Sequence, residues 1–188
     1  MLQNFSYHTH STWSDGCNTL REMLDRAVSL GWKEIGFSDH LIVHKDMKKS
    51  PSWLRMQKEK AWIYGDSFAA AAEKFKTYKS ELLELAQEYP LKIYFGAEVD
   101  YFPYPEWKRE FRAFQNEIGL DYYISGNHFL IDNDNQVIDP HSIEYLGYDE
   151  NRQKELLSRH FRIMAEAVAS GLFTFLAHLD YMRRVKIC

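Results

Sequence analysis

The 188-residue sequence predicts an α/β fold, in which helices pack on a mostly parallel sheet that is either open or closed into a barrel. Short stretches of strand character alternate with longer segments whose apolar residues recur at helical spacing. The segments between the strands are long and helical, as parallel strands require, because a tight hairpin joins only antiparallel strands. The composition is globular, with 45% apolar and 27% charged residues, and the length suits one domain or most of a larger one.

The expected elements alternate regularly along the chain. Strands are expected at residues 4–8, 34–38, 91–97, 121–125 and 173–177. Helices are expected at residues 19–30, 67–89, 106–118 and 149–170. The first helix begins with a capping box, in which Asn18 or Thr19 is the N-cap and Glu22 reaches back to it, and the helix ends at Gly31. Pro90 stops the second helix.

Two of these helices show an apolar stripe that we expect to face the core. The stripe of the second helix comprises Phe68, Ala72, Phe75, Leu82, Leu85 and Tyr89. The stripe of the last helix comprises Leu156, Leu157, Phe161, Met164, Ala165 and Val168. Residues 41–65 show no such pattern, and we expect an irregular segment there that covers a site. The polar "DNDNQ" after the apolar "HFLI" indicates a turn.

Charge and composition argue against several classes of protein. The formal net charge of −4 does not suit a basic surface that binds nucleic acid. No run approaches the roughly 18 apolar residues of a membrane span, and residues 1–5 show no signal peptide. The two cysteines, Cys17 and Cys188, do not make a disulfide framework. We therefore expect a cytoplasmic protein that binds neither a membrane nor nucleic acid.

The chemistry lies where the predicted strands end. Each strand delivers a histidine or a glutamate at its C-terminal end, namely His8 with His10, His40, Glu98, His128 and His178. In barrels and doubly wound sheets this edge is where active sites are built. His8 and His10 are two residues apart in an extended segment, so both point to the same side and can reach one ion.

Each of these residues taken alone has an ordinary structural explanation. A bare His-x-His pair is weak evidence for metal, and His40 could cap a helix or satisfy a core hydrogen bond. Glu98 could be a surface carboxylate, and His128 and His178 could be packed in the core. The joint pattern is harder to explain in this way, because five of the eight histidines fall at strand ends of one polarity.

The other three histidines are expected to lie outside the site. His44 falls in the irregular segment and is expected to be exposed to solvent. His141 follows Asp139 and Pro140 in a loop and is interpreted as a bystander. His160 is in the middle of a helix and is expected at a surface or an interface.

The side chains gathered at the strand ends are imidazoles and a carboxylate, without a thiolate. This set suits Zn, Mn or Fe better than Mg or Ca. Water bound to such an ion can ionise near neutral pH and become a nucleophile. A centre with several ions would also neutralise the charge of a phosphate ester. The residues therefore predict hydrolysis, with a phosphoester as the favoured substrate.

Five segments of the sequence resemble, in order, the motifs of the polymerase and histidinol phosphatase (PHP) superfamily: "HTHSTWSDG", "GFSDH", "GAEVDYFP", "GNHF" and "FLAHLDYMRR". "KIYFGAEVDYFP" and "AHLDYMRR" are most similar to its histidinol-phosphate phosphatase branch. The resemblance covers essentially the whole chain, as one domain over residues 1–188. It implies a distorted (β/α)7, TIM-like barrel of seven parallel strands.

The resemblance also implies a metal centre of two or three ions of Zn, Mn or Fe. Its implied ligands are His8, His10 and Glu98 for the first ion, Glu98, His128 and His178 for the second, and Asp15 and His40 for the third. Glu98 and His128 would be central to catalysis, in which a hydroxide between the ions attacks the phosphorus of L-histidinol phosphate. Arg183 or Arg184 would clamp the phosphate. A basic surface pair is an equally good reading of these two arginines.

The sequence departs from the family pattern after His178. The family's final motif contributes an aspartate and a histidine as Asp-x-His, whereas no histidine follows His178 here and Asp180 is too close to replace that aspartate. The barrel is therefore expected to lack its last one or two strands. The open edge could be covered by a second copy of the chain.

Several alternatives follow from this departure. The chain could be a truncated product, a short member that completes its site by oligomerisation, or a degenerate domain that binds metal or phosphate without turnover. Among enzymes, the alternative is another PHP phosphoesterase that acts on nucleotides or small phosphate esters.

Overall fold

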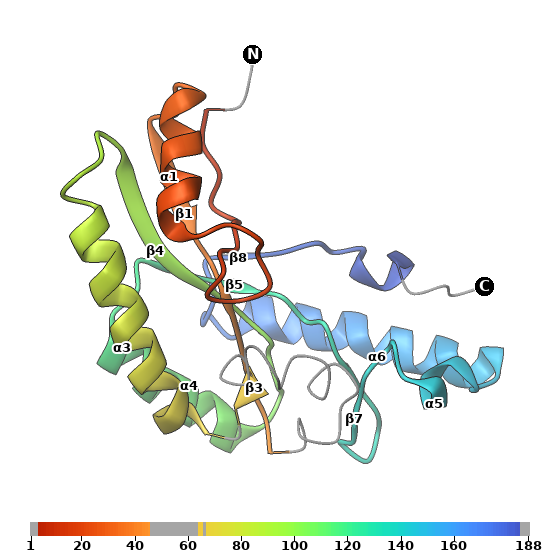
Figure 1. Cartoon of the computed structure of the whole chain (residues 1–188). Coiled ribbons are helices and arrows are strands. Elements are labelled where there is room, and N and C mark those ends of the chain that lie inside the picture. Colours follow the sequence, from red (N-terminus) through yellow and green to blue (C-terminus); the bar gives the residue numbers. More distant parts are fainter. Residues whose placement is uncertain (1–3, 46–63, 66, 185–188) are drawn as a thin grey trace.

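The computed structural model describes residues 4–45, 64–65 and 67–184 (Figure 1). Its helices are α1 (Leu20–Ser29), α3 (Phe68–Leu85), α4 (Pro105–Ile118), α5 (Ile143–Leu146) and α6 (Glu150–Ala169), followed by a final 3-10 helix (Tyr181–Arg184). Its strands are β1 (Glu34–Phe37), β2 (His40–Val43), β3 (Tyr64–Gly65), β4 (Lys92–Val99), β5 (Tyr122–Ser125), β6 (Leu130–Ile131), β7 (Val137–Ile138) and β8 (Phe175–Leu176).

The main sheet is parallel throughout and has the order β3-β2-β4-β5-β8. The long strand β4 also pairs with β1, so β1 and β2 lie along successive parts of it, Phe37 opposite Phe95 and His40 opposite Glu98. Within the described residues β3 and β8 end the pairing order and leave the sheet open. The predicted α/β class and the parallel sheet are thus confirmed.

Helices α3 and α4 pack against each other and form the aromatic part of the core (Figure 1). The large apolar residues of α4 recur at helical spacing and are all buried: Trp107, Phe111, Phe114 and Ile118. The ring of Phe114 lies 5.5 Å from those of both Phe68 and Phe75 on α3, measured between centroids. Each such ring removes a large apolar area from water, about 1.5–3 kcal/mol per side chain.

The helix boundaries follow the local signals closely. The capping box of α1 is confirmed with Thr19 as N-cap, because the hydroxyl of Thr19 accepts from the backbone N–H of Glu22 and Glu22 accepts from that of Thr19. Gly31 follows the helix with a φ of 72°, the left-handed region that glycine adopts without strain. The second helix begins after Ser67 but ends at Leu85, so Tyr89 lies beyond it. Tyr78 joins the buried face instead.

The predicted stripe of the last helix was only partly right, because Leu156 and Met164 are buried but Phe161, Ala165 and Val168 are exposed. The buried residues of α6 are Leu156, His160, Ile163, Met164 and Ala167. Phe161 and Val168, which were expected inside, are 53% and 61% exposed. His160, Ile163 and Ala167 are buried in place of Phe161, Ala165 and Val168.

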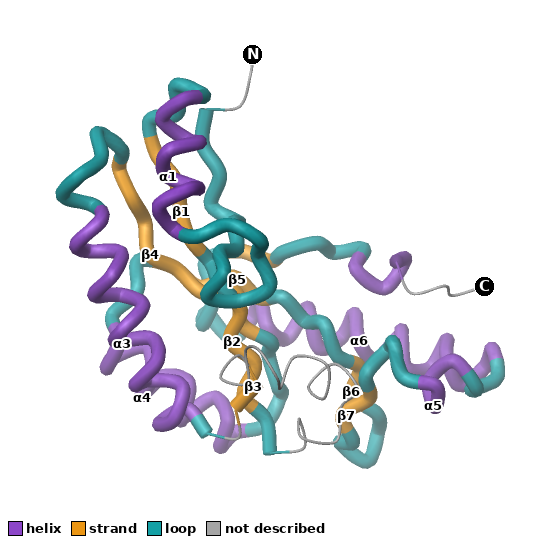
Figure 2. Tube along the Cα trace, viewed as in Figure 1, coloured by secondary structure: helices purple, strands orange, loops and turns teal. Residues whose placement is uncertain are grey.

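Two extended regions also differ from the prediction. Residues 4–8 are extended beside β1 and are drawn as loop in Figure 2. The backbone N–H groups of Lys33 and Gly36 donate to the carbonyls of Asn4 and Ser6, but no strand is formed. Residues 41–43 and 64–65, expected to be irregular, belong to β2 and β3, and residues 46–63 lie outside the described residues.

The second half of the chain differs from the prediction in two smaller respects. The last strand is two residues long rather than five. The turn after "HFLI" joins two short antiparallel strands, β6 and β7, in a hairpin that was not predicted. None of the helices in the described ranges is both long enough and apolar enough to cross a membrane.

Candidate metal centre

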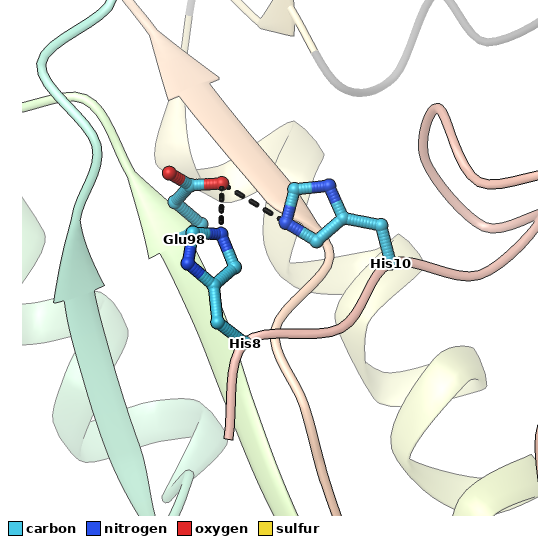
Figure 3. Close-up of side chains that lie close together, drawn as sticks. All are labelled: His8, His10 and Glu98. Atoms are coloured by element: carbon cyan, nitrogen blue, oxygen red, sulfur yellow. Dashed lines mark hydrogen bonds and ion pairs between the residues drawn. The ribbon is translucent and has the colours of Figure 1, made fainter. Parts of the chain in front are cut away.

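The centre is built around the carboxylate of Glu98, which is fully buried near the end of β4. His8 and His10 approach it from the extended segment beside β1, and Figure 3 shows both rings directed at the same oxygen, Oε2. Their Nε2 atoms lie 3.1 and 3.0 Å from that oxygen. The predicted effect of their spacing, two rings on one side of an extended segment, is therefore present in the structure.

Three more imidazoles complete the surroundings of Glu98. His40, opposite Glu98 in the sheet, places Nδ1 3.3 Å from Oε2. His178 and His128 face the other oxygen, Oε1, with Nε2 at 2.7 and 3.5 Å. Burying one carboxylate with five imidazoles within 3.5 Å is costly in a protein core, so the arrangement indicates a binding site.

Close packing at this point depends on Gly126. A Cβ there would lie 2.5 Å from the ring of His128 and 2.9 Å from Oε1 of Glu98. The absence of a side chain lets His128 fold back over the end of β4. Any larger residue would displace one of the two groups.

Asp15 adds a second carboxylate, from the loop that follows His10. Its Oδ1 lies 2.8 Å from Nδ1 of His10 and 3.6 Å from Nε2 of His40. It is about half exposed, so it forms the solvent side of the cluster.

Among the described residues, three sets offer ligand atoms close enough together for one cation. The sets are His8, His10 and Glu98; His10, Asp15 and His40; and His40, Glu98 and His128. His10 and His40 each belong to two sets, so the ligands are shared more widely than the resemblance implies. Which side chain binds which ion stays a prediction, including the role of His178 beside Glu98.

The charges of the cluster support one another. Burial opposes ionisation of Glu98, but the close imidazoles of His10, His178 and His8 outweigh it and hold its pKa well below the usual range. Burial likewise lowers the pKa of His10, but Asp15 and Glu98 outweigh this and raise it to about 10. Without a cation the ring of His10 therefore carries a proton. A bound cation would replace this proton and take over the same charge.

The residues fit a metal ion in two respects. The Nε2 of His10 and the Nδ1 of His40 are buried and make no hydrogen bond within the described residues, although both face Oε2 of Glu98. A buried polar atom without a partner costs about 1–3 kcal/mol, which a bound cation would offset. The donor set of imidazoles and carboxylates is also that of Zn, Mn and Fe sites.

A buried carboxylate that sequence reasoning missed orients one of these ligands. Asp100 accepts from Nδ1 of His128 at 2.7 Å and also from its backbone N–H. Its charge raises the pKa of His128 to about 9 against the effect of burial. Its position two residues after Glu98 was the available signal, because ligands in metal sites are commonly held by a neighbouring carboxylate.

The remaining candidate residues either lie outside the cluster or have side chains that the structure does not describe. His141 is exposed, 3.4 Å from Asp139, and belongs to none of the three sets among the described residues. His44, expected at the surface, is buried and stacks on Phe102 at 4.6 Å. Arg183 and Arg184 lie in the final 3-10 helix, and their side chains are outside the described part. Their phosphate-binding role stays a prediction.

Tyr181 is an aromatic neighbour that the sequence reasoning did not single out. Its ring lies 4.8 Å from that of His128 and 5.2 Å from that of His178, between centroids. It therefore forms one wall beside these two imidazoles. Its place three residues after His178 was the only signal in the sequence.

His160 was expected at the surface but is 2% exposed within α6. Burial lowers its pKa to about 4, despite a hydrogen bond to the backbone of Phe129. The ring is thus neutral in the folded protein at pH values where it would be protonated in the unfolded chain.

We expect the metal-free protein to lose stability through His160 as the pH falls from about 6.5 to about 4. Above the unfolded pKa, about 6.5, the ring is neutral in both states and contributes nothing. Below it the unfolded chain gains a proton that the folded chain excludes. Between pH 7 and pH 5 this amounts to roughly 2 kcal/mol in the free energy of unfolding. Urea unfolding in chelator at both pH values measures it, and His160→Gln should remove this part of the pH dependence. Equal pH dependence in both proteins would contradict the assignment.

An α/β fold with imidazoles and carboxylates at the ends of its parallel strands has the donor set of a metal site. The chain belongs to the PHP domain family, whose model matches residues 6–186. The PHP-type fold predicted from the motifs is thereby confirmed. That residues 1–188 form a single domain short of its last strands stays a prediction.

Comparison with solved structures finds the putative histidinol phosphatase hisK from Listeria monocytogenes. It is 22% identical over 74% of this chain and 50% of that chain, with a TM-score of 0.44. This chain thus spans about half the length of that protein. The likeness is too distant to assign a substrate to this chain. No curated protein matches the sequence.

Proposed function

We propose that this protein is a metal-dependent phosphoester hydrolase, and specifically a histidinol-phosphate phosphatase. The observation that carries the proposal is the buried carboxylate of Glu98 with five imidazoles at 2.7–3.5 Å. Membership of the PHP domain family and the segments "KIYFGAEVDYFP" and "AHLDYMRR" support the substrate.

The residues have distinct roles in this proposal. Glu98 would hold the ions, together with His8, His10 and His40 beside one of its oxygens and His128 and His178 beside the other. Two or three ions of Zn, Mn or Fe, when bound, supply an activated water and positive charge for the phosphate. Asp100 keeps the ring of His128 oriented. Arg183 or Arg184, a few residues after His178, binds a phosphate oxygen.

Two other functions remain as alternatives. A PHP phosphoesterase acting on nucleotides or small esters would use the same centre, although the net charge of −4 does not favour a polyanionic substrate. A domain that binds metal or phosphate without turnover is the alternative outside enzymes.

We also propose that a second copy of the chain covers the edge at β8, which ends the pairing order in the described sheet.

We expect the protein, stripped of metal and reloaded with Mn or Zn, to release phosphate from L-histidinol phosphate. Its kcat/KM should exceed those for a nucleoside monophosphate and an aryl phosphate by about tenfold or more, since contacts to the non-reacting part of a substrate contribute to the rate. Colorimetric phosphate assays measure this, with chelated protein as the control. Preference for the nucleotide would favour the first alternative. Bound metal without hydrolysis of any of the three esters would favour the second.

A further inference from the structure

Asp39 lies between β1 and β2, is fully buried and accepts four hydrogen bonds. Its Oδ1 accepts from the backbone N–H of Ser11 at 2.8 Å and from the hydroxyl of Ser14 at 2.5 Å. Its Oδ2 accepts from the hydroxyls of Ser11 at 2.9 Å and Tyr78 at 2.5 Å. A buried carboxylate needs hydrogen-bond donors such as these to offset the loss of contact with water.

The donors link Asp39 to one of the three candidate cation sets, that of His10, Asp15 and His40. Ser11 directly follows His10, Ser14 directly precedes Asp15, and Asp39 itself directly precedes His40. One carboxylate is thus attached, by a peptide bond or by a hydrogen bond to a neighbouring residue, to every member of that set.

The loop that presents Asp15 is held tightly between these attachments. The backbone N–H groups of Ser14 and Gly16 both donate to the carbonyl of Ser11 at 3.0 Å. A Cβ at Gly16 would lie 2.1 Å from the carbonyl oxygen of His10, so the turn has no room for a side chain. The loop therefore has a defined shape, and Asp39 is the group that fixes it to the sheet.

Tyr78 completes the network from α3. Burial and the charge of Asp39 hold its pKa well above the usual value, so its hydroxyl keeps its proton and donates. An asparagine at position 39 would turn an N–H toward two of the four donors and leave them without an acceptor. The network can therefore be broken without any change in side-chain size.

We propose that Asp39 is a positioning residue that sets the separation of His10, Asp15 and His40 and so determines whether the cation site nearest to Asp15 is filled. The inference rests on the proposed metal-dependent function. The effect is expected to be largest at the set that contains Asp15, because the side chain of Asp39 is hydrogen-bonded to the loop that presents Asp15, whereas none of its four donors adjoins His128 or His178.

The test is metal stoichiometry after equilibrium dialysis against Mn, measured by elemental analysis on folded protein. Asp39→Asn should lose the same metal equivalent as Asp15→Asn, or bind it at least tenfold more weakly, and retain the rest. The double variant should lose no more than Asp15→Asn alone, because both changes act on one site. Tyr78→Phe and Ser14→Ala each remove one donor and leave the carboxylate of Asp39 in place, so they should weaken metal binding at that site by a few-fold. They replace Asp39→Asn in the test if that variant does not fold.

Asp25 and Tyr89 offer a matched control, since they form an exposed Tyr–Asp hydrogen bond of 2.7 Å and belong to none of the three candidate cation sets among the described residues. Asp25→Asn should leave the metal content unchanged. A folded Asp39→Asn protein with full metal content at unchanged affinity would overturn the inference, as would the loss of every ion. If the wild type itself binds no metal, the proposed function fails instead.

Discussion

Replacing Glu98 by glutamine should abolish metal binding at the centre of the cluster and lower phosphate release roughly 10³-fold. Glu98 belongs to two of the three cation sets among the described residues, and its two oxygens face different imidazoles. Glutamine keeps the size but has no charge and only one acceptor oxygen. Metal ions contribute several kcal/mol to such hydrolysis, and about 4 kcal/mol corresponds to three orders of magnitude.

Elemental analysis and a phosphate-release assay on the same preparation measure both effects of Glu98→Gln. Glu117→Gln is a suitable control, because that exposed carboxylate pairs with Lys76 on the surface. It should retain its metal and its activity. Circular dichroism shows whether each variant is folded. Full metal content in folded Glu98→Gln would contradict the role of Glu98, and with it the proposed function.

The cluster could be predicted because it depends on rules that are local in the sequence. A parallel sheet places the C-terminal ends of its strands at one edge, so His8, His40, Glu98, His128 and His178 could be brought together without knowing how the helices pack. Even the failure to form a strand at residues 4–8 did not matter, because an extended segment gives His8 and His10 the same side.

Burial of single groups could not be predicted in this way. On α6, two neighbouring faces have helical spacing, one with Phe161 and Val168 and one with His160 and Ala167, and hydropathy favours the first. The structure buries the second, together with a histidine that local pattern placed outside. Which face of a helix is buried depends on the elements it meets, and here α6 meets β6.

The supporting carboxylates were missed for a related reason. Asp39 and Asp100 adjoin recognised ligands in the sequence, but their importance lies in partners far along the chain. Tyr78 reaches Asp39 from α3, 39 residues away, and His128 reaches Asp100 from 28 residues away. A single sequence shows a carboxylate beside a ligand, but it does not show what the carboxylate holds.

Replacing Asp100 by asparagine should weaken metal binding and lower activity by roughly 10–100-fold, the usual effect of removing a carboxylate behind a ligating histidine. With Asp100 accepting from Nδ1, the Nε2 of His128 is the nitrogen left for a cation, on the side of Glu98. Asparagine can instead donate to Nδ1, which would place the proton on Nε2 and block it. The loss should therefore be in affinity for metal, with the fold intact.

The same variant has a distinct signature in the metal-free protein. Asp100 raises the pKa of His128 to about 9, so at pH 7 the ring holds a proton that a cation must displace, and wild-type metal affinity should rise as the pH approaches 9. In Asp100→Asn the ring should titrate at a lower pH by NMR. Asp139→Asn, which alters an Asp–His pair outside the cluster, should change neither the metal affinity nor the titration of His128. Unchanged metal affinity in Asp100→Asn would mean that Asp100 does not orient His128 for a cation.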